Sequence, residues 1–186
     1  MRGDVAEART LFKSFWALWR KYRALPEVFD LKNNLQHFGR DSPLRPELAE
    51  SALHLYLATK DDHYLVVGRE LIYALQNISR VPCGFASIAD AQTHRLDDRM
   101  DSYFIAETLK YLFLLMDLSL DPPLRKSFFC AQQHECEAYN ATCVAACDAN
   151  CVPMDSILFS TEGHLFDMRH RPWQRDHFGP FASLKL

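Results

Sequence analysis

A cation and two carboxylates are grouped where a helix is expected to begin. Arg45, Pro46 and Glu47 are consecutive, and Glu50 follows one turn later, so its side chain shares a helix face with that of Glu47. Proline is favoured in the first turn of a helix, and the helix dipole stabilises acidic side chains there. A solvated helix start would explain the group by itself. Acid–base or ligand-binding chemistry is the alternative interpretation.

A third carboxylate, Glu107, lies inside an apolar segment, directly after Ile105 and Ala106. A glutamate in such a helix either faces solvent or is buried beside a partner, and periodicity leaves both possibilities open. Farther along, an apolar run typical of a strand, Ile157 to Ser160, is followed by a short polar string of possible ligands: Thr161, Glu162, Gly163 and His164. A lone histidine such as His164 is more typical of a structural role than of a ligand.

Helical periodicity predicts the elements that must position these side chains. Apolar residues recur at helical spacing over 6–23, from Pro46 to Thr59, over 64–78 and over 98–116. A polar turn at 59–62 predicts an antiparallel helical hairpin from the second and third helices. Between the third and fourth helices, Phe85 to Asp90 could form a short extended segment.

Composition limits the class of protein. The chain has 186 residues, of which 48% are hydrophobic and 24% charged, with a formal net charge of −3. These values fit a globular core and exclude wholesale disorder. The near-neutral balance gives no electrostatic reason to expect a nucleic-acid partner. No segment reaches the roughly 18–20 apolar residues of a transmembrane helix, and charges near Met1 argue against a signal peptide in this chain.

The cysteines are concentrated in one segment. Five of the six lie between Cys130 and Cys151, at spacings that fit neither common zinc-finger pattern. The segment 118–156 is therefore expected to be a Cys-rich insertion stapled by disulfides in an oxidising compartment. Two sequons for N-glycosylation, beginning at Asn77 and Asn140, agree weakly with that compartment.

Three ordered motifs resemble one enzyme family. PLRPELAES, residues 43–51, resembles the arginine-proline-glutamate motif of class I α-mannosidases, glycoside hydrolase family 47. DRMDSYFIAETLKYL, residues 98–112, resembles the long signature helix of that family, and FSTEGH, residues 159–164, resembles its terminal motif. VPCGFA, residues 81–86, is similar to the branch of ER degradation-enhancing α-mannosidase-like proteins.

The resemblance implies an all-α fold, a partial (α/α)7 barrel built from helical hairpins around a mannose-binding pocket. Residues 1–168 would be the C-terminal portion of the catalytic domain, and 169–186 would be a tail. The Cys-rich insertion 118–156 and the short β-like segment would interrupt the helices. A partial barrel is expected to expose apolar helix faces.

The resemblance also implies a function: Ca²⁺-dependent, inverting α-1,2-mannosidase activity on high-mannose N-glycans of misfolded glycoproteins in the lumen of the endoplasmic reticulum. Glu47 would be the general base. Thr161 would ligate Ca²⁺ through its hydroxyl and backbone carbonyl. Sugar hydroxyls and waters of the Ca²⁺ shell would be bound by the remaining matched positions: Arg45, Glu50, Tyr103, Glu107 and Glu162.

Departures from the family pattern qualify this interpretation. The family's general acid lies upstream of the matched motifs, so we expect this chain alone to be inactive. Tyr103 replaces the usual phenylalanine, Gly163 replaces alanine, and Asp101 stands where glutamate is common. The resemblance also implies that a cysteine at the position of Cys83 pairs with one in the upstream half of the protein, and that the protein works with disulfide isomerase-like oxidoreductases. Without that upstream half, Cys83 would be left as a free thiol.

Two other functions remain open. The first is a non-catalytic glycan-binding or scaffold fragment of endoplasmic-reticulum quality control, which would keep glycan or Ca²⁺ contacts without turnover. The second is a disulfide-rich secreted interaction module, for which only the segment from Cys130 to Cys151 argues.

Overall fold

The computed structural model describes residues 4–30, 38–120, 129–130, 152–153, 157–159 and 163–167. The chain divides into two compact units, one formed by Asp4–Ser119 and the other by Met1–Gly3 with Leu120–Leu186. Most of the described residues are helical, and their strands are short, so the predicted all-α class is confirmed in this coarse form. The partial barrel and the Cys-rich insertion remain predictions.

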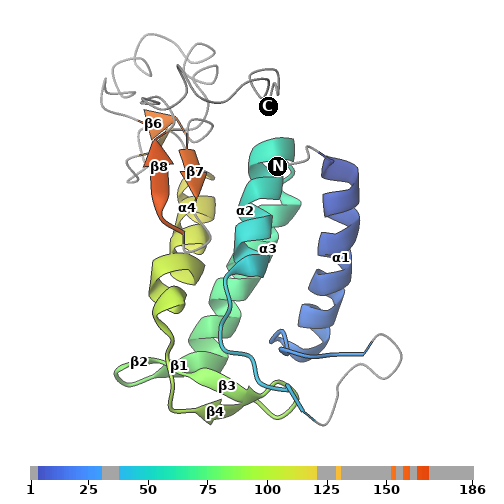
Figure 1. Ribbon diagram of the computed structural model, residues 1–186, viewed down its shortest axis with the longest axis vertical. Helices are drawn as coiled ribbons and strands as arrows, with labels where there is room; N and C mark the ends of the chain where they lie inside the picture. The colour runs from blue at the N-terminus through green and yellow to red at the C-terminus, as the bar shows by residue number, and fades with distance from the viewer. Residues whose placement is uncertain are drawn as a thin grey trace, which may run out of the picture. The chain divides into compact units, whose positions relative to one another are not determined.

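Helices build the unit Asp4–Ser119 (Figure 1). In chain order they are α1 (Val5–Tyr22), α2 (Glu47–Thr59), α3 (His63–Ala74) and α4 (Lys110–Asp117). A π-helical turn, η1 (Leu75–Ser79), continues α3, and another, η2 (Phe104–Leu109), leads into α4. In a π-helix the backbone hydrogen bonds span five residues, and such turns are frequent at functional sites.

Local sequence explains where these helices begin and end. The carboxylate of Asp4 accepts a hydrogen bond of 3.0 Å from the backbone N–H of Glu7, which caps the start of α1. Arg23 and Lys60 adopt left-handed backbone conformations, with φ of 57° and 55°, and close α1 and α2 respectively. The helical segments predicted from periodicity over 6–23 and 46–59 therefore agree with α1 and α2.

The core is centred on α2, which packs against α1, α3 and α4. Ala52 and Leu53 of α2 are fully buried, as is Val67 of α3. At Gly68 a β-carbon would lie 2.7 Å from side-chain atoms of both Leu115 and Met116, so α3 and α4 approach closely there. Shortening a buried leucine such as Leu53 to alanine typically costs about 2–5 kcal/mol, so this packing is the main support of the helical unit.

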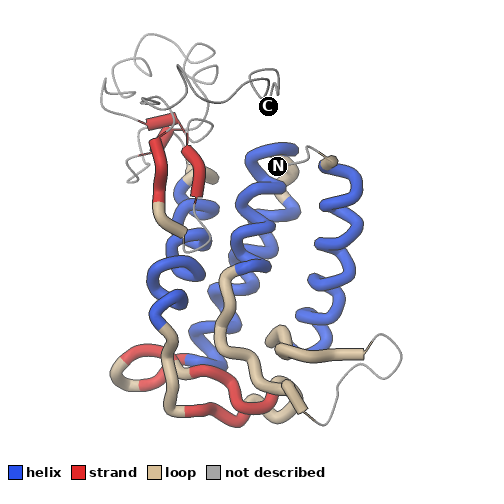
Figure 2. The backbone as a smooth tube through the Cα atoms, in the orientation of Figure 1, coloured by secondary structure: helices blue, strands red, loops and turns tan. Residues whose placement is uncertain are grey.

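Two antiparallel ladders lie at one end of the helices (Figure 2). The first pairs β1 (Arg80–Val81) with β2 (Gly84–Phe85). The second pairs β3 (Ser87–Asp90) with β4 (Arg95–Asp97), and its register shifts between Ile88 and Asp90. The extended segment predicted at Phe85 to Asp90 is therefore confirmed.

The predicted start of the fourth helix at Asp98 is wrong. Asp98–Met100 are not helical, and helical backbone begins only at Ser102. The carbonyl of Arg99 accepts a hydrogen bond of 2.8 Å from the N–H of Ser87, and the N–H of Arg99 donates to the carbonyl of Asp97 at 2.7 Å. This segment is thus held to β3, and its pairing overrides the helical tendency of the sequence.

The other unit contains short strands among its described residues. β5 (Phe129–Cys130) runs parallel to β6 (Val152–Pro153). β7 (Ile157–Phe159) pairs in antiparallel register with β8 (Leu165–Asp167), which confirms the predicted strand there. Thr161, Glu162, the tail and most of the Cys-rich segment lie outside the described residues.

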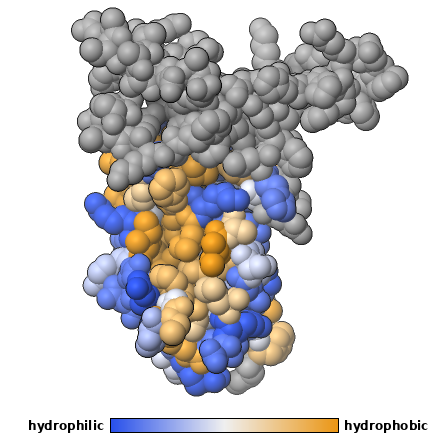
Figure 3. Space-filling view, turned by 90° about the vertical axis from the view of Figure 1, so that its left-hand side faces the viewer, coloured by the Kyte–Doolittle hydropathy of each residue, from blue (hydrophilic) through white to orange (hydrophobic). Residues whose placement is uncertain are grey.

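An apolar surface follows η2 and α4. Figure 3 views the molecule from the side on which α4 lies in Figure 1, and apolar side chains gather there between hydrophilic ones. Ile105 and Phe113, two helical turns apart, are exposed by 59% and 52%. An exposed apolar stripe of this kind is typical of a helix that packs against further helices.

Candidate functional site

The loop before α2 is attached to η2 through its backbone carbonyls. The hydroxyl of Thr108 donates a buried hydrogen bond of 2.7 Å to the carbonyl of Leu44. The hydroxyl of Tyr103 lies 3.1 Å from the carbonyl of Pro43 and 2.8 Å from the Oδ2 of Asp101, so one hydrogen faces two acceptors. The Arg-Pro-Glu segment is therefore positioned by side chains about 60 residues later in the sequence.

Leu44 itself has an unusual backbone. Its φ is +62°, a left-handed conformation that costs a non-glycine residue roughly 1–2 kcal/mol, and its side chain is buried. The bond from Thr108 and the burial of the leucine side chain offset this strain. The turn at Leu44 therefore determines the direction of the backbone at Arg45, the next residue.

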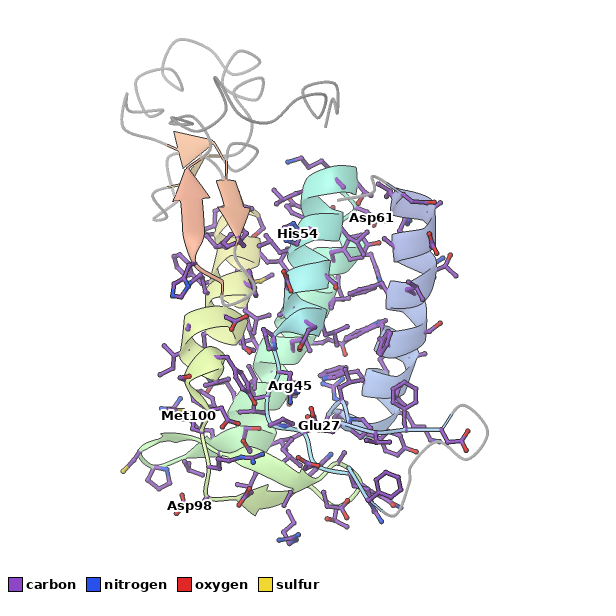
Figure 4. All side chains as sticks on the ribbon, in the orientation of Figure 1. Glu27, Arg45, His54, Asp61, Asp98 and Met100 are labelled. Carbon is purple, nitrogen blue, oxygen red and sulfur yellow. The ribbon has the colours of Figure 1, made fainter. Side chains whose placement is uncertain are left out.

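Arg45 is held by Glu27, a residue that no sequence pattern indicated. Its Nε donates to Oε1 of Glu27 at 2.5 Å, and its Nη2 donates to Oε2 at 2.8 Å, so the pair is bidentate (Figure 4). The guanidinium also lies 5.6 Å from the centre of the Tyr103 ring. The hydrogen bond that Arg45 donates to Glu27 is the main cause that raises the pKa of Arg45.

Glu27 could not be singled out from the sequence. It follows Pro26 in a loop, where an acidic residue gives no periodic signal, and its partner lies 18 residues away. The only local signal at Glu27 is its position directly after Pro26, in a segment that shows little helical periodicity.

Three carboxylates converge from two elements. Glu47 and Glu50 come from the first turn of α2, whereas Glu107 comes from η2 and is buried, which answers the question that periodicity left open. Burial raises the pKa of Glu50, and the negative charges of Glu47 and Glu107 raise it further. α2 and η2 pack against each other, so these three predicted site residues lie in one region of the helical unit.

Tyr111 and His54 border this group. Burial raises the pKa of Tyr111 to about 12, with further contributions from the charges of Glu50 and Glu107. The Nε2 of His54 lies 3.9 Å from Oε1 of Glu50, and burial lowers the pKa of His54. The imidazole is consequently neutral near pH 7 and provides little positive charge to balance the carboxylates.

Burial also affects Tyr103, whose ring was predicted to contact a sugar. Loss of solvation raises its pKa to about 12, and the hydrogen bond to Asp101 acts in the same direction. The phenol is therefore a neutral donor at any physiological pH. The hydroxyl that distinguishes it from phenylalanine serves to fasten the loop at Pro43.

The predicted metal ligand, Thr161, stays a prediction. Thr161 and Glu162 lie outside the described residues, so their distances to Glu47 and Glu107 are not part of this geometry. Within the described ranges, no group of three or more His, Cys, Asp or Glu side chains is arranged to hold a metal ion by itself. In the same ranges, no helix combines the length and apolar character needed to cross a bilayer.

Comparisons with known proteins agree with the motifs. Human ER degradation-enhancing alpha-mannosidase-like protein 2 is 44% identical over 116 residues, 62% of this chain and 20% of that protein. Alpha-mannosidase I MNS4 of Arabidopsis thaliana is 43% identical over 122 residues, 65% of this chain and 20% of that protein. ER degradation-enhancing alpha-mannosidase-like protein 1 of Schizosaccharomyces pombe is 34% identical over 171 residues, 92% of this chain and 18% of that protein.

The chain thus spans about a fifth of the length of these relatives. Among solved structures, alpha-1,2-mannosidase from Trichoderma reesei superimposes with a TM-score of 0.47 and 24% identity over 71% of this chain and 23% of that one, a likeness too small to bear on function. The sequence profile of glycosyl hydrolase family 47 matches residues 1–137, and the chain therefore belongs to that family.

Proposed function

We propose that this chain is part of an inverting α-1,2-mannosidase that trims high-mannose N-glycans of misfolded glycoproteins. The convergence of Glu47 and Glu50 from α2 with Glu107 from η2 carries the proposal. Clustered carboxylates are the groups with which glycosidases activate water and hold sugar hydroxyls. The names of the relatives, mannosidases and degradation-enhancing mannosidase-like proteins, support the same substrate class.

Glu47 is the proposed general base. It is exposed in the first turn of α2, so water can reach its carboxylate and give up a proton to it. An inverting glycosidase also needs a carboxylic acid roughly 6.5–9.5 Å away, on the other face of the sugar, to protonate the leaving oxygen. That acid is proposed to come from the remaining length of a protein like the relatives, of which this chain spans about a fifth.

Arg45 is proposed to bind a sugar hydroxyl or a carboxylate. A guanidinium has five N–H donors, of which the bidentate pair with Glu27 uses two. The others remain available on an exposed side chain whose direction is already fixed. Tyr103, beneath the same guanidinium, is proposed to contact the mannose ring with its aromatic surface.

Ca²⁺ is the proposed cofactor. Thr161 would be its ligand through hydroxyl and carbonyl oxygens, the hard donors that Ca²⁺ prefers. Glu50, Glu107 and Glu162 are proposed to hold waters of its shell together with sugar hydroxyls. Burial is the main cause of the raised pKa of Glu50, and a dication near these acids would relieve the repulsion from Glu47 and Glu107 that adds to it. When bound, it would supply coordination of mannose hydroxyls that favours the distorted, oxocarbenium-like transition state.

The endoplasmic-reticulum lumen is the proposed compartment, in keeping with the names of the relatives. Cys83, in the turn between β1 and β2, is an exposed free thiol. An exposed thiol can attack a disulfide to form a mixed disulfide, so Cys83 is proposed as the contact with a disulfide isomerase-like oxidoreductase.

Substituting Glu47→Gln in the full-length protein tests the proposed function. The change keeps the shape and removes the base, so kcat for mannose release from a high-mannose N-glycan should fall by roughly 10²–10⁴. Glu70→Gln is the matched control. Glu70 lies on α3, forms an ion pair with Arg23 at 2.7 Å, and is not one of the three carboxylates Glu47, Glu50 and Glu107. Turnover like that of wild type in Glu47→Gln would contradict the assignment.

A non-catalytic glycan-binding or scaffold role is the second candidate. It is favoured by the exposed guanidinium of Arg45, which Glu27 fixes in direction and which keeps N–H donors for a ligand. The isolated chain would then bind a high-mannose glycan without releasing mannose, and Arg45→Ala would weaken that binding. Mannose release by the isolated chain would exclude this alternative.

A further inference from the structure

Asn77 has the sequence and the position of a glycan acceptor. It begins the sequon Asn77-Ile78-Ser79 and lies in η1, at the end of α3. Its side chain is exposed, whereas Ser79 is 1% exposed and Ile78 packs against the core cluster that contains Ile88. The backbone therefore directs the asparagine outward and the rest of the sequon inward.

The hydrogen bonding of Asn77 is compatible with a glycan. Its Nδ2 donates a hydrogen bond of 2.7 Å to the carbonyl of Tyr73. An asparagine amide has two N–H groups, and a glycosylated one keeps one of them. The bond to Tyr73 can therefore persist after modification and would fix the direction in which the first sugar leaves the helix.

Tyr73 offers a surface for that sugar. It lies four residues before Asn77, on the same helix face, and its side chain is 64% exposed. An aromatic face is an apolar platform on which the C–H groups of a sugar ring can pack.

We propose that Asn77 carries an N-linked glycan, which would pack over Tyr73. The proposal rests on the proposed endoplasmic-reticulum location, where the donor is an oligosaccharide linked to a polyprenyl diphosphate. The Nδ2 of Asn77 forms a bond to C1 of the donor sugar. The bond from C1 to the diphosphate oxygen breaks, its electron pair leaves with the diphosphate, and the amide nitrogen loses one proton.

Ser79 sets the timing of this modification. The hydroxyl of the sequon must be accessible to the transferase, but in the folded chain Ser79 is buried and its carbonyl accepts a hydrogen bond of 2.8 Å from Ala86. The transfer therefore takes place before η1 and the following ladder form. The folded, unmodified protein should not be a substrate.

The test places the chain behind a secretion leader, with Asn140→Gln removing the second sequon. Mass spectrometry of the denatured protein before and after treatment with an N-glycan amidase should show one glycan. Adding Asn77→Gln should abolish it. The matched control combines Gln76→Asn with Asn77→Gln, which exchanges two neighbouring side chains and moves the asparagine out of register with Ser79. This control should also lack the glycan.

An unmodified chain in the Asn140→Gln background would overturn the proposal and leave the proposed function untouched. The full-length protein, produced in its own cells with an extra C-terminal sequon, tests the compartment separately. If neither Asn77 nor the added sequon is modified there, both the location and the glycan are refuted. If the glycan packs over Tyr73, the glycosylated chain should melt at a higher temperature than the chain from which the glycan has been removed. Tyr73→Ala should abolish this difference, and an unchanged difference would refute the packing over Tyr73.

Discussion

Glutamates occupy two contrasting environments on the two elements that meet at the site. The first turn of α2 presents Glu47 to solvent, where a carboxylate is stabilised by the helix dipole and by water. η2 buries Glu107 beside Thr108, whose hydroxyl holds the preceding loop. The comparison shows a division of roles: the start of α2 presents side chains that a ligand can reach, and the buried residues of η2 hold the loop before α2 in place.

The largest effect on stability is expected at the buried residue Thr108 of η2. Thr108→Val removes a hydroxyl and leaves the carbonyl of Leu44 without this buried bond, which should lower the free energy of unfolding by about 1–3 kcal/mol. Thr10→Val is the matched control, because the hydroxyl of Thr10 donates to a helix carbonyl at an exposed position. Urea denaturation of both variants measures the difference, and equal midpoints would show that η2 does not anchor the loop.

A smaller effect on stability is expected at the exposed ion pair of Glu27 and Arg45. Glu27→Gln breaks the bidentate pair with Arg45, whose side chain is 48% exposed, and exposed ion pairs contribute about 0.2–1 kcal/mol to stability. The change should instead raise KM for the glycan in the full-length protein, since the guanidinium loses its fixed direction. Steady-state kinetics together with denaturation separate the two effects. A large loss of stability with an unchanged KM would contradict this role.

The smallest effect is expected at Glu50, where a substitution should increase the stability of the fold and not decrease it. Because the folded chain raises the pKa of Glu50, protonation of this group stabilises the fold below about pH 4.5, and this contribution is lost as the pH rises through the raised pKa. Glu50→Gln should therefore stabilise the chain slightly at pH 7 and leave its stability nearly unchanged at pH 4.

Melting curves at the two pH values measure this difference. Destabilisation at pH 7 would mean that the charge of Glu50 is favourably bound in the fold. A gain in stability combined with loss of mannose release in the full-length protein would mark Glu50 as a group kept for function at the expense of stability.

Much of this arrangement could be predicted from the sequence, and the failures have physical causes. Periodicity predicted α1, α2 and the helical character around Glu107, because amphipathic spacing persists along each. It could not decide whether Glu107 is buried, since a π-helical turn alters the spacing on which that inference depends. The left-handed backbone at Leu44 and the partner Glu27 arise from tertiary contacts, which no local pattern encodes.

Residue types alone suggested chemistry at Arg45 and Glu47 only weakly, and the order of the motifs strengthened the inference. The roles of Thr161 and Glu162 stay predictions, because they lie outside the described residues. The start of the fourth helix was misplaced because backbone pairing between Arg99 and Ser87 competes with helix formation.

The missing side chain of Gly68 has a consequence far from its own position. α4 continues directly from η2, so the separation between α3 and α4 also determines how far Glu107 and Thr108 can reach toward the start of α2. An alanine at residue 68 would require the ends of the Leu115 and Met116 side chains to shift away from α3. When homologous sequences are compared, residue 68 should therefore be examined together with the acidic site residues.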